Sequence, residues 1–238
     1  VAGPRVLEHL VDCVLQFEGD RYHEHRTLRA TKNRFGSTTE LAVFEMRDSG
    51  LVGVPDPSQL LGRARPGEVG AAVACALEGT RPLLLEIEAL VSPTEVVPPR
   101  RVASGVDPKR LALIVAVLGR HARLPLGSAD VFVNVAGGVR IEEPGVDLAV
   151  ALAIASAARG VPVCERSAAF GEIGLTGRLR SSLHAERRLA ECRKLGIERV
   201  IVPAGAPTGG GLPRVLAVER LAEAIRAGLA PAPAATPA

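Results

Sequence analysis

Apolar and polar positions in the first 54 residues alternate in short runs, each of the length typical of a β-strand. The expected strands are 11–17, 27–32, 39–46 and 51–54. Residues 33–37 have the composition of a hairpin tip, and Asp48-Ser49-Gly50 favours a second tight turn. This part of the chain therefore predicts a sheet with few helices to cover it. Such a sheet exposes apolar surface unless another segment packs on it.

From residue 68 the pattern changes to alternating helices and strands, after a Pro- and Gly-rich stretch at 59–67 that predicts a linker. The expected helices are 68–77, 108–118, 148–158, 185–195 and 218–227, and the expected strands are 83–91, 131–135, 168–173 and 199–202. Asp107 followed by Pro108 is typical of a helix start. The helices near 111–118 and 148–158 carry apolar residues on nearly every side, which predicts burial. Residues 229–238, almost all Ala and Pro, predict a disordered tail.

Composition narrows the classes of function. The 238 residues are 47% hydrophobic and 23% charged, which is ordinary for one large globular domain, or one domain and a fragment. Only 3% are aromatic, so extended stacking of bases on aromatic side chains is not expected. No apolar run is long enough for a membrane span. The start at Val1, without Met or a charged-then-apolar leader, predicts a fragment of a longer protein and no signal peptide.

The cysteines give no sign of a metal site. They are Cys13, Cys75, Cys164 and Cys192, and no two of them have C-x-x-C spacing. All four lie in apolar stretches, which favours free, buried thiols in a reducing cytoplasm. No metal ligand is therefore expected in this chain.

The search for nucleotide-binding motifs finds one candidate and one absence. No G-x-x-x-x-G-K-[ST] motif occurs, so the chain alone is not expected to bind ATP as a P-loop protein. Lys32 and Arg34 stand two residues apart at the expected hairpin tip. A cation supplied by one subunit can neutralise charge on the γ-phosphate held by another, as an arginine finger does. On charge alone, a solvated basic turn is the simpler interpretation of this pair.

The longer string around this pair favours the first interpretation. Lys32-Asn33-Arg34-Phe35-Gly36, with Phe17-Glu18-Gly19-Asp20-Arg21 upstream, resembles the bacterial RadA (Sms) family of DNA-repair proteins. Members of this family are ring-forming, RecA-like ATPases that drive branch migration in recombination. The resemblance implies that residues 1–58 are the C-terminal strands of an ATPase core, and that Lys32 and Arg34 act on nucleotide or DNA at a subunit interface. It places ATP, Mg²⁺ and a zinc module in the parent protein, and no cofactor in this chain.

Residues 68–228 extend the resemblance. Four segments look like the C-terminal domain of the same family: Glu78-Gly79-Thr80-Arg81-Pro82, Pro99-Arg100-Arg101-Val102-Ala103-Ser104-Gly105-Val106-Asp107, Val133-Asn134-Val135-Ala136-Gly137-Gly138 and Gly171-Glu172-Ile173-Gly174-Leu175-Thr176-Gly177. That domain resembles the proteolytic domain of Lon proteases, which has the ribosomal protein S5 domain 2-like fold. The expected class is therefore α/β (α+β), with a β-rich remnant of a RecA-like core followed by a Lon protease-like domain.

The Lon-like domain is expected to be proteolytically inactive. Lon proteases use a Ser nucleophile that is activated by a Lys base. The position that matches the Ser is Gly145, which has no side chain to attack a carbonyl. The position that matches the Lys is Glu186, whose carboxylate does not replace a neutral amine, so no catalytic residue is expected. Ser181, Ser182 and His184 lie nearby, but a turn before a helix explains them more simply than a second dyad does.

What remains for this domain is contact with DNA and assembly. The candidate phosphate contacts are Arg100, Arg101, Lys109, Arg110, Arg178, Arg180, Arg187 and Arg188. Adjacent arginines in an extended segment project to opposite sides, so one of Arg100 and Arg101 would face a given row of phosphates. The polar side of the helix at 185–195 is expected to carry Arg187, Arg188, Arg193 and Lys194. For each group, ion pairs between subunits or a solvated surface are the alternative.

We therefore expect the DNA-binding and ring-assembly part of a RadA-type, ATP-dependent repair protein that acts in homologous recombination and branch migration. The resemblance implies single-stranded or branched DNA, further copies of the chain in a hexamer, and a recombinase or other recombination proteins as partners. It implies no membrane, and a place at the nucleoid in the cytoplasm. The parent would hydrolyse ATP, whereas this chain is not expected to be active alone. The alternatives are a residual peptidase or peptide-binding module and a purely structural scaffold for oligomerisation.

Overall fold

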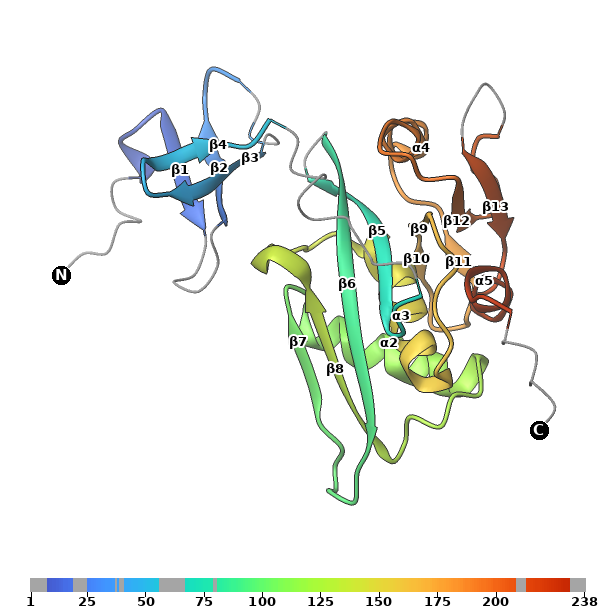
Figure 1. Cartoon of the computed structure of the whole chain (residues 1–238). Coiled ribbons are helices and arrows are strands. Elements are labelled where there is room, and N and C mark those ends of the chain that lie inside the picture. Colours follow the sequence, from blue (N-terminus) through green and yellow to red (C-terminus); the bar gives the residue numbers. More distant parts are fainter. Residues whose placement is uncertain are drawn as a thin grey trace.

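The computed structural model describes residues 8–18, 25–36, 38, 41–55, 67–78, 81–208 and 213–231. A small four-stranded sheet near the N-terminus stands beside a larger unit, residues 67–231, which is built on a seven-stranded sheet (Figure 1). The larger sheet mixes parallel and antiparallel strands and carries helices, which confirms the α/β class. The expected linker at 59–67 lies outside the described residues except for its last position. No described helix has the length and apolar character needed to cross a bilayer.

The small sheet, which we call the N-terminal sheet, confirms the expected strands. It consists of β1 (Cys13–Glu18), β2 (His25–Asn33), β3 (Leu41–Arg47) and β4 (Gly50–Gly53), each antiparallel to the next. On one face, Val43 is only 3% exposed and belongs to the core of the large-sheet unit. An ion pair of 3.3 Å between Arg29 and Glu78 also joins the two units.

The opposite face of the N-terminal sheet is apolar and open. Leu15 and Phe17 lie on the same side of β1, because side chains alternate along a strand, and they are 59% and 55% exposed. Phe17 contacts the ring of Phe44 in β3, with 5.9 Å between the ring centroids. Met46 and Leu51, which are paired across β3 and β4, are each 45% exposed. The expectation that this sheet needs a further covering segment is therefore consistent with its surface.

The larger sheet has the strand order β13-β12-β9-β5-β6-β8-β7. Its strands are β5 (Ala71–Glu78), β6 (Arg81–Pro93), β7 (Arg101–Ser104), β8 (Ala129–Val135), β9 (Ser167–Ala169), β12 (Arg199–Pro203) and β13 (Arg214–Val218). A separate short hairpin is formed by β10 (Glu172–Ile173) and β11 (Leu179–Arg180). The strands β5–β6 and β6–β8 pair antiparallel, whereas the other neighbours in the large sheet pair in parallel.

Helices cover both faces of the large sheet unequally. Their bounds are α2 (Pro108–His121), α3 (Asp147–Arg159), α4 (Ala185–Lys194) and α5 (Leu221–Gly228), with short 3₁₀ turns η2 (Ala136–Gly138) and η3 (Pro144–Val146). Residues of α2, α3 and α5 share one core with one side of β5 and β6, whereas residues of α4 share a second core with the other side. The Asp107 carboxylate caps α2 by accepting a hydrogen bond of 2.9 Å from the Arg110 amide.

The helix expected at 68–77 is wrong, because this run forms the central strand β5. Ala72, Ala74 and Ala76 face the first core, and Val73 and Cys75 face the second. Both faces of β5 are therefore buried, and the sequence lacks the alternation of polar and apolar residues that usually indicates a strand. Pairing with β6 and β9 outweighs the helical propensity of alanine.

Several expected boundaries also shift. The strand expected at 168–173 is split, because β9 ends at Ala169 and β10 pairs with β11 instead. The last helix begins at Leu221, since Val218 ends strand β13, which was not expected. Strand β7 was also not expected. The tail begins later than residue 229, because Leu229 is only 9% exposed and the Ala230 amide donates to the carbonyl of Pro162 at 2.9 Å. Residues 232–238 lie outside the described part.

Gly105 shows where the chain needs a residue without a side chain. Its φ is +79°, and a Cβ placed there would lie 2.6 Å from both the Val135 Cβ and the Val139 carbonyl oxygen. Its own carbonyl accepts a hydrogen bond of 2.8 Å from the Ile141 amide. The turn between β7 and α2 therefore passes directly against the end of β8.

We expect Gly105→Ala to lower the free energy of unfolding by more than about 1 kcal/mol, because the new methyl group meets packed atoms at a positive φ. Gly127→Ala is the matched control, since a Cβ there has no neighbour within 4 Å. Urea unfolding followed by circular dichroism measures both. Equal stabilities of the two variants would contradict the packing described at Gly105.

Candidate nucleic-acid interface

The starts of α2, α3 and α4 meet at one end of the large-sheet unit. We call this the helix-start end and define it as residues 107–110, 143–147 and 182–188. Ion pairs join Arg110 to Asp147 and Arg188 to Glu143, so side chains from α2 and α4 reach the segment that opens α3. Six of the eight predicted DNA-contacting residues belong to this end or to the β10–β11 hairpin beside it: Lys109, Arg110, Arg178, Arg180, Arg187 and Arg188.

Gly145, the expected counterpart of a catalytic serine, lies buried in η3. A Cβ at this position would overlap the carboxylate of Glu143 and lie 3.1 Å from the hydroxyl of Ser182. A serine side chain would therefore displace Glu143 before it could act as a nucleophile. The place where a nucleophile would project is filled by a carboxylate that is part of the fold.

Arg188 is the cation beside Glu143 and Gly145. The expectation that it contacts DNA from the polar side of α4 is wrong. It is completely buried and forms an ion pair with Glu143. Its guanidinium also donates to the carbonyls of Leu183, at 2.9 Å, and of Cys75, and lies 5.3 Å from the centre of the Phe170 ring. Arg188 is therefore structural and is not available to a phosphate.

The position of Glu186 also differs from what a catalytic base requires. Glu186 is exposed on α4, whereas Arg188, two residues further on, reaches the neighbourhood of Gly145 through Glu143. An arginine keeps its proton at neutral pH and cannot act as a base. Neither residue of α4 therefore supplies the function of a Lys base.

The alternative dyad of Ser and His is not assembled among the described residues. The hydroxyl oxygen of Ser182 is buried, and no described group forms a hydrogen bond with it. His184 and Ser181 are exposed, and His184 adopts a φ of +56° at the start of α4. Activation of a serine requires a hydrogen-bonded base, so this geometry gives no support for a hydrolase.

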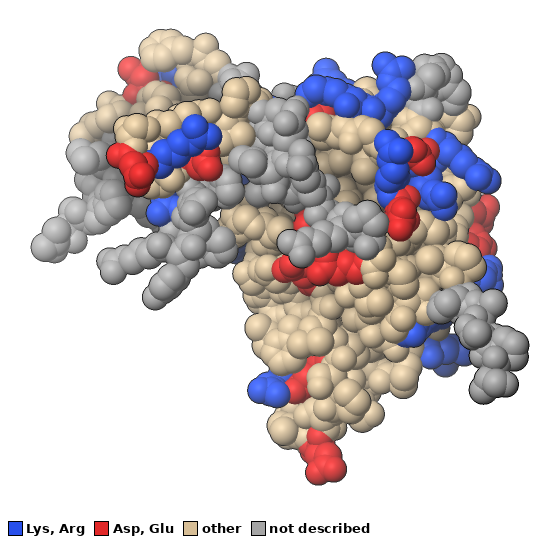
Figure 2. All heavy atoms as spheres, viewed as in Figure 1, with Lys and Arg blue, Asp and Glu red and all other residues tan. Residues whose placement is uncertain are grey.

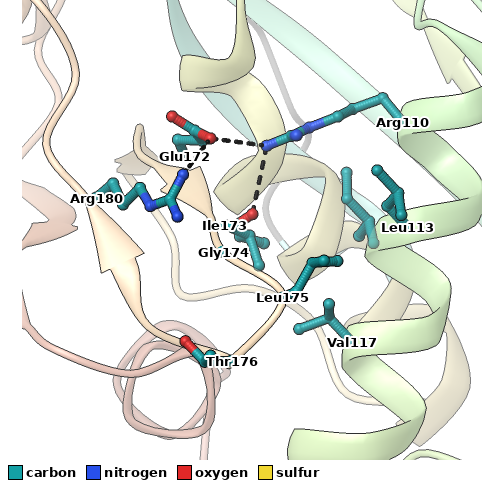
Figure 3. A pocket seen from close by; sticks show the side chains of 10 residues that line it. Arg110, Leu113, Val117, Glu172, Ile173, Gly174, Leu175, Thr176 and Arg180 are labelled. Atoms are coloured by element: carbon teal, nitrogen blue, oxygen red, sulfur yellow. Dashed lines mark hydrogen bonds and ion pairs between the residues drawn. The ribbon is translucent and has the colours of Figure 1, made fainter.

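Arg110 is the centre of a second network at the helix-start end. Its Nε donates to Asp147 at 2.8 Å, and the Asp147 carboxylate also accepts from the Ile173 amide at 2.9 Å. Burial raises the pKa of Asp147, while Arg110 and the Ile173 amide oppose that rise by stabilising the carboxylate. Glu172 lies 3.6 Å from Arg110 and 3.3 Å from Arg180 (Figure 3). Much of the Arg110 charge is therefore compensated within the protein.

The other predicted cations near this end differ in whether their side chains already have a partner in the protein. Lys109 and Arg187 are exposed, and no hydrogen bond or ion pair joins the side chain of either one to another described residue. Arg178 and Arg180 are 62% and 67% exposed and form ion pairs with Glu219 and Glu172. Exposed pairs of this kind contribute little to stability, so their guanidinium groups can exchange to a phosphate.

Arg100 and Arg101 lie at the start of β7, whose other end leads through the Gly105 turn to α2 and Lys109. Arg100 binds Asp130 through Nε at 2.8 Å and Nη2 at 2.6 Å, and lies over the ring of Phe132. Arg101 donates to carbonyls instead, including that of Leu126 at 2.6 Å. Both side chains therefore hold β7 to its surroundings, and they form no continuous patch with Lys109.

The hairpin tip keeps its cations at the surface. Arg34 is 64% exposed and forms an ion pair of 3.0 Å with Asp12, and the Lys32 ammonium donates to the carbonyl of Glu8 at 2.5 Å. The Asn33 side chain accepts from the Phe35 amide at 3.1 Å, which shapes the turn. The turn therefore holds the Arg34 guanidinium at the surface, where its exposed ion pair with Asp12 is weak. Such a guanidinium is free to exchange Asp12 for a phosphate.

No group of three His, Cys, Asp or Glu side chains suited to a metal ion occurs in the part of the chain that the structure describes. The four cysteines are free thiols, of which Cys75 and Cys192 are buried and Cys13 is exposed. The pKa of Cys75 is raised by its hydrogen bond with Cys192 and by burial, so this thiol is a poor ligand at neutral pH.

Basic side chains gather on the part of the large-sheet unit that carries α4 (Figure 2). Figure 2 shows Lys and Arg side chains gathered where α4, β12 and β13 lie, and acidic side chains nearer the middle of the same face. Exposed cations in these elements include Arg214, which the sequence analysis did not single out. A prediction of strand β13 from the sequence would have placed Arg214 at the start of that strand.

We expect Arg188→Met to lower the free energy of unfolding by about 3 kcal/mol, because Glu143 would lose its partner and two carbonyls their donor. Arg187→Met, the exposed neighbour on the same helix, is expected to change it by less than about 0.5 kcal/mol. Thermal unfolding of the two variants gives the comparison. Similar effects of the two substitutions would show that Arg188 is not the buried link described here.

We expect Asp130→Asn to destabilise the protein at pH 7 and to lose this effect in acid. Hydrogen bonds from Arg100 hold the pKa of Asp130 below its ordinary value, so its ionised form stabilises the fold. That contribution is present above a pH of about 4 and disappears as the pH falls through the folded-state pKa. Urea unfolding between pH 7 and pH 3, with the exposed Asp48→Asn as control, measures the difference. A constant difference across this range would contradict the assignment.

Comparison with known proteins places these features in a family. A sequence profile described as "Subunit ChlI of Mg-chelatase" matches residues 112–206, within the large-sheet unit. The DNA repair protein RadA of Bacillus subtilis (strain 168) is 46% identical over 233 residues, which are 96% of this chain and 51% of that protein. RadA of Streptococcus pneumoniae is 47% identical over 92% of this chain and 52% of its own length. RadA of Brucella abortus (strain 2308) is 50% identical over 87% of this chain and 44% of its own length. The chain thus spans about half the length of the curated relatives it matches, and it belongs to the RadA family, as the motif around Arg34 indicated.

Proposed function

We propose that this chain is the DNA-binding and ring-assembly part of a RadA-type protein that acts in DNA repair, in homologous recombination and branch migration. The observation that carries the proposal is the identity of 46–50% to proteins named DNA repair protein RadA, over 87–96% of the chain. The partners in this proposal are DNA, further copies of the chain in a hexamer, and recombination proteins such as a recombinase. The site of action would be the nucleoid.

The proposal assigns the large-sheet unit to a Lon protease-like domain of the ribosomal protein S5 domain 2-like fold that has lost proteolysis. Supporting this, Gly145 leaves no room for a nucleophile beside Glu143, and the buried cation at that place is Arg188. The buried hydroxyl of Ser182 has no described hydrogen-bond partner. A residual peptidase finds no support in this geometry.

The proposal assigns the N-terminal sheet to the last strands of a RecA-like ATPase core. Its open apolar face, with Leu15, Phe17 and Met46 about half exposed, is the kind of surface that the rest of such a core would cover. ATP and Mg²⁺, and a zinc module, would then belong to the remainder of the parent protein. Arg34, exposed at the hairpin tip, would reach the nucleotide of a neighbouring subunit, with Lys32 beside it.

For DNA, the proposal relies on the cations that the fold leaves unengaged. Lys109 lies in the first turn of α2 and Arg187 in the first turn of α4, where backbone N–H groups add to the attraction for an anion. Arg180 is exposed near Arg110, to which Glu172 links it, and can exchange its partner. Such contacts with phosphate give binding that is independent of sequence and falls with salt. Arg100, Arg101 and Arg178 would make secondary contacts elsewhere.

We expect Lys109→Glu with Arg187→Glu to weaken the binding of a fluorescent single-stranded oligonucleotide, and to reduce the slope of log affinity against log salt by about 1.4 or more, since two phosphate contacts are lost. Fluorescence anisotropy across a salt series measures both quantities. The matched control is Arg120→Glu with Arg159→Glu, which makes the same charge change on exposed residues at the far ends of α2 and α3.

Two results would contradict this proposal. One is the absence of DNA binding by the wild-type chain at low salt, and the other is an equal loss of affinity in the test and control variants. The second result would show that net charge alone governs the binding.

A further inference from the structure

Two apolar surface features of the large-sheet unit are distinct from the phosphate contacts proposed for Lys109 and Arg187, although Arg180 borders one of them. One is a pocket that runs along α2, and the other is the exposed tip of the connection between β6 and β7. Each leaves apolar side chains in water, and each carries a charged group at its edge. Their properties are complementary.

The pocket lies between α2 and the turn that follows β10, and has a volume of about 320 Å³ (Figure 3). Leu113 and Val117 of α2 line one wall, and Leu175 lines the other. Leu113 is 43% exposed and Leu175 is 68% exposed, so the burial expected all around α2 is wrong on this side. The wall of the pocket is therefore apolar and open to solvent.

One end of the pocket carries more accessible positive than negative charge. Arg180 is 67% exposed and Arg110 is 27% exposed, whereas Glu172, 30% exposed, is the carboxylate between them. Asp147, which compensates Arg110, is only 1% exposed and presents no charge to an incoming group. The pocket thus offers an apolar wall followed by a cationic edge, which suits an aliphatic segment with an adjacent carboxylate.

The tip of the β6–β7 connection has this composition. Val96 is 55% exposed and Val97 is 91% exposed, and Glu95, also exposed, precedes them. The tip is held in shape, because the Thr94 amide donates to the Ser128 carbonyl at 3.0 Å and the Val96 amide donates to the Thr94 hydroxyl at 3.2 Å. A preformed apolar projection loses little conformational freedom when it is buried against a partner.

The tip cannot fill the pocket of its own chain. Pairing of Pro93 with Ala129 fixes the tip at the end of the long strands. Figure 1 shows the tip projecting at the far end of β6 and β7, well separated from the β10–β11 hairpin that borders the pocket. The two surfaces can meet only between molecules.

We propose that the tip of one copy docks in the α2 pocket of the next copy, with Val96 and Val97 against Leu113 and Leu175 and with Glu95 beside Arg180. This inference rests on the ring assembly included in the proposed function and names the surfaces that would make it. Because the two surfaces differ, the contact is heterologous. Repetition of such a contact gives a closed ring when the rotation between copies closes.

Sedimentation velocity over a concentration series tests the docking. We expect the wild-type chain to assemble, and Val97→Asp or Arg180→Glu to raise the concentration needed for assembly at least about tenfold, as loss of a central contact does. Leu90→Asp places the same change on a different exposed side chain, 60% exposed in β6, and is expected to assemble as the wild type does. Circular dichroism confirms that each variant is folded.

A charge exchange separates a direct contact from a general effect. Glu95→Arg and Arg180→Glu are each expected to weaken assembly, and the double variant is expected to recover a large part of it, because the pair is restored with its signs reversed. Recovery in the double variant supports the docking. Equal assembly of the wild type and all variants, or no recovery in the double variant, would overturn it.

The outcome also distinguishes this inference from the proposed function. A wild-type chain that assembles regardless of these variants would leave ring assembly standing and refute the tip-and-pocket contact. A wild-type chain that stays monomeric throughout would refute both the ring assembly by this chain and the contact. DNA binding, measured by anisotropy with the Lys109 and Arg187 variants, would stand or fall independently of either result.

Discussion

The buried pairing of Arg188 with Glu143 is the interaction on which the large-sheet unit depends. One guanidinium joins the start of α4, the end of β5 and the segment that opens α3, through bonds to Leu183, Cys75 and Glu143. Glu143 in turn accepts from the Leu77 amide at 2.7 Å. Removing either charge would leave the other one without its partner in the interior, which costs far more than an exposed pair is worth. The same pair occupies the space in front of Gly145, so stability and the absence of a nucleophile have one physical cause.

Charge compensation also decides which arginines remain for a ligand. Arg100 binds the carboxylate of Asp130, Arg110 that of Asp147 and Arg188 that of Glu143. Arg101 donates its hydrogen bonds to backbone carbonyls instead. Of the 29 basic residues, all but Lys32, Lys109 and Lys194 are arginines, and this abundance therefore overstates the basic surface. Lys109 and Arg187 stand out because the described residues offer them no such partner and because each lies in the first turn of a helix.

The sequence predicts an element well when one side of it is exposed, and poorly when both sides are buried or when distant contacts decide its position. The strands of the N-terminal sheet alternate visibly because one side is open, and Asp107-Pro108 marked the start of α2 correctly. Strand β5 was hidden because both of its faces are buried among small residues. Arg188 was expected on the polar side of α4 because an arginine is charged, although its position along the helix indicates burial. It stands four residues before the buried Cys192, on the same side of α4, and this spacing was the available signal. The pocket along α2 arises from the 174–176 turn, whose position depends on contacts distant in sequence, such as that between His121 and the Leu175 carbonyl.

Strand β2 connects the two units in a way that has a mechanical consequence. It ends at Asn33, directly before Arg34, and carries Arg29 within its length, about 16 Å from the tip for five residues of extended chain. Arg29 is bound to Glu78 at the end of β5, and Val43 on the neighbouring strand is anchored in the core of the larger unit. Any movement of the hairpin tip that carries Arg34 would therefore reach β5 of the larger unit through the backbone of β2 and the ion pair between Arg29 and Glu78.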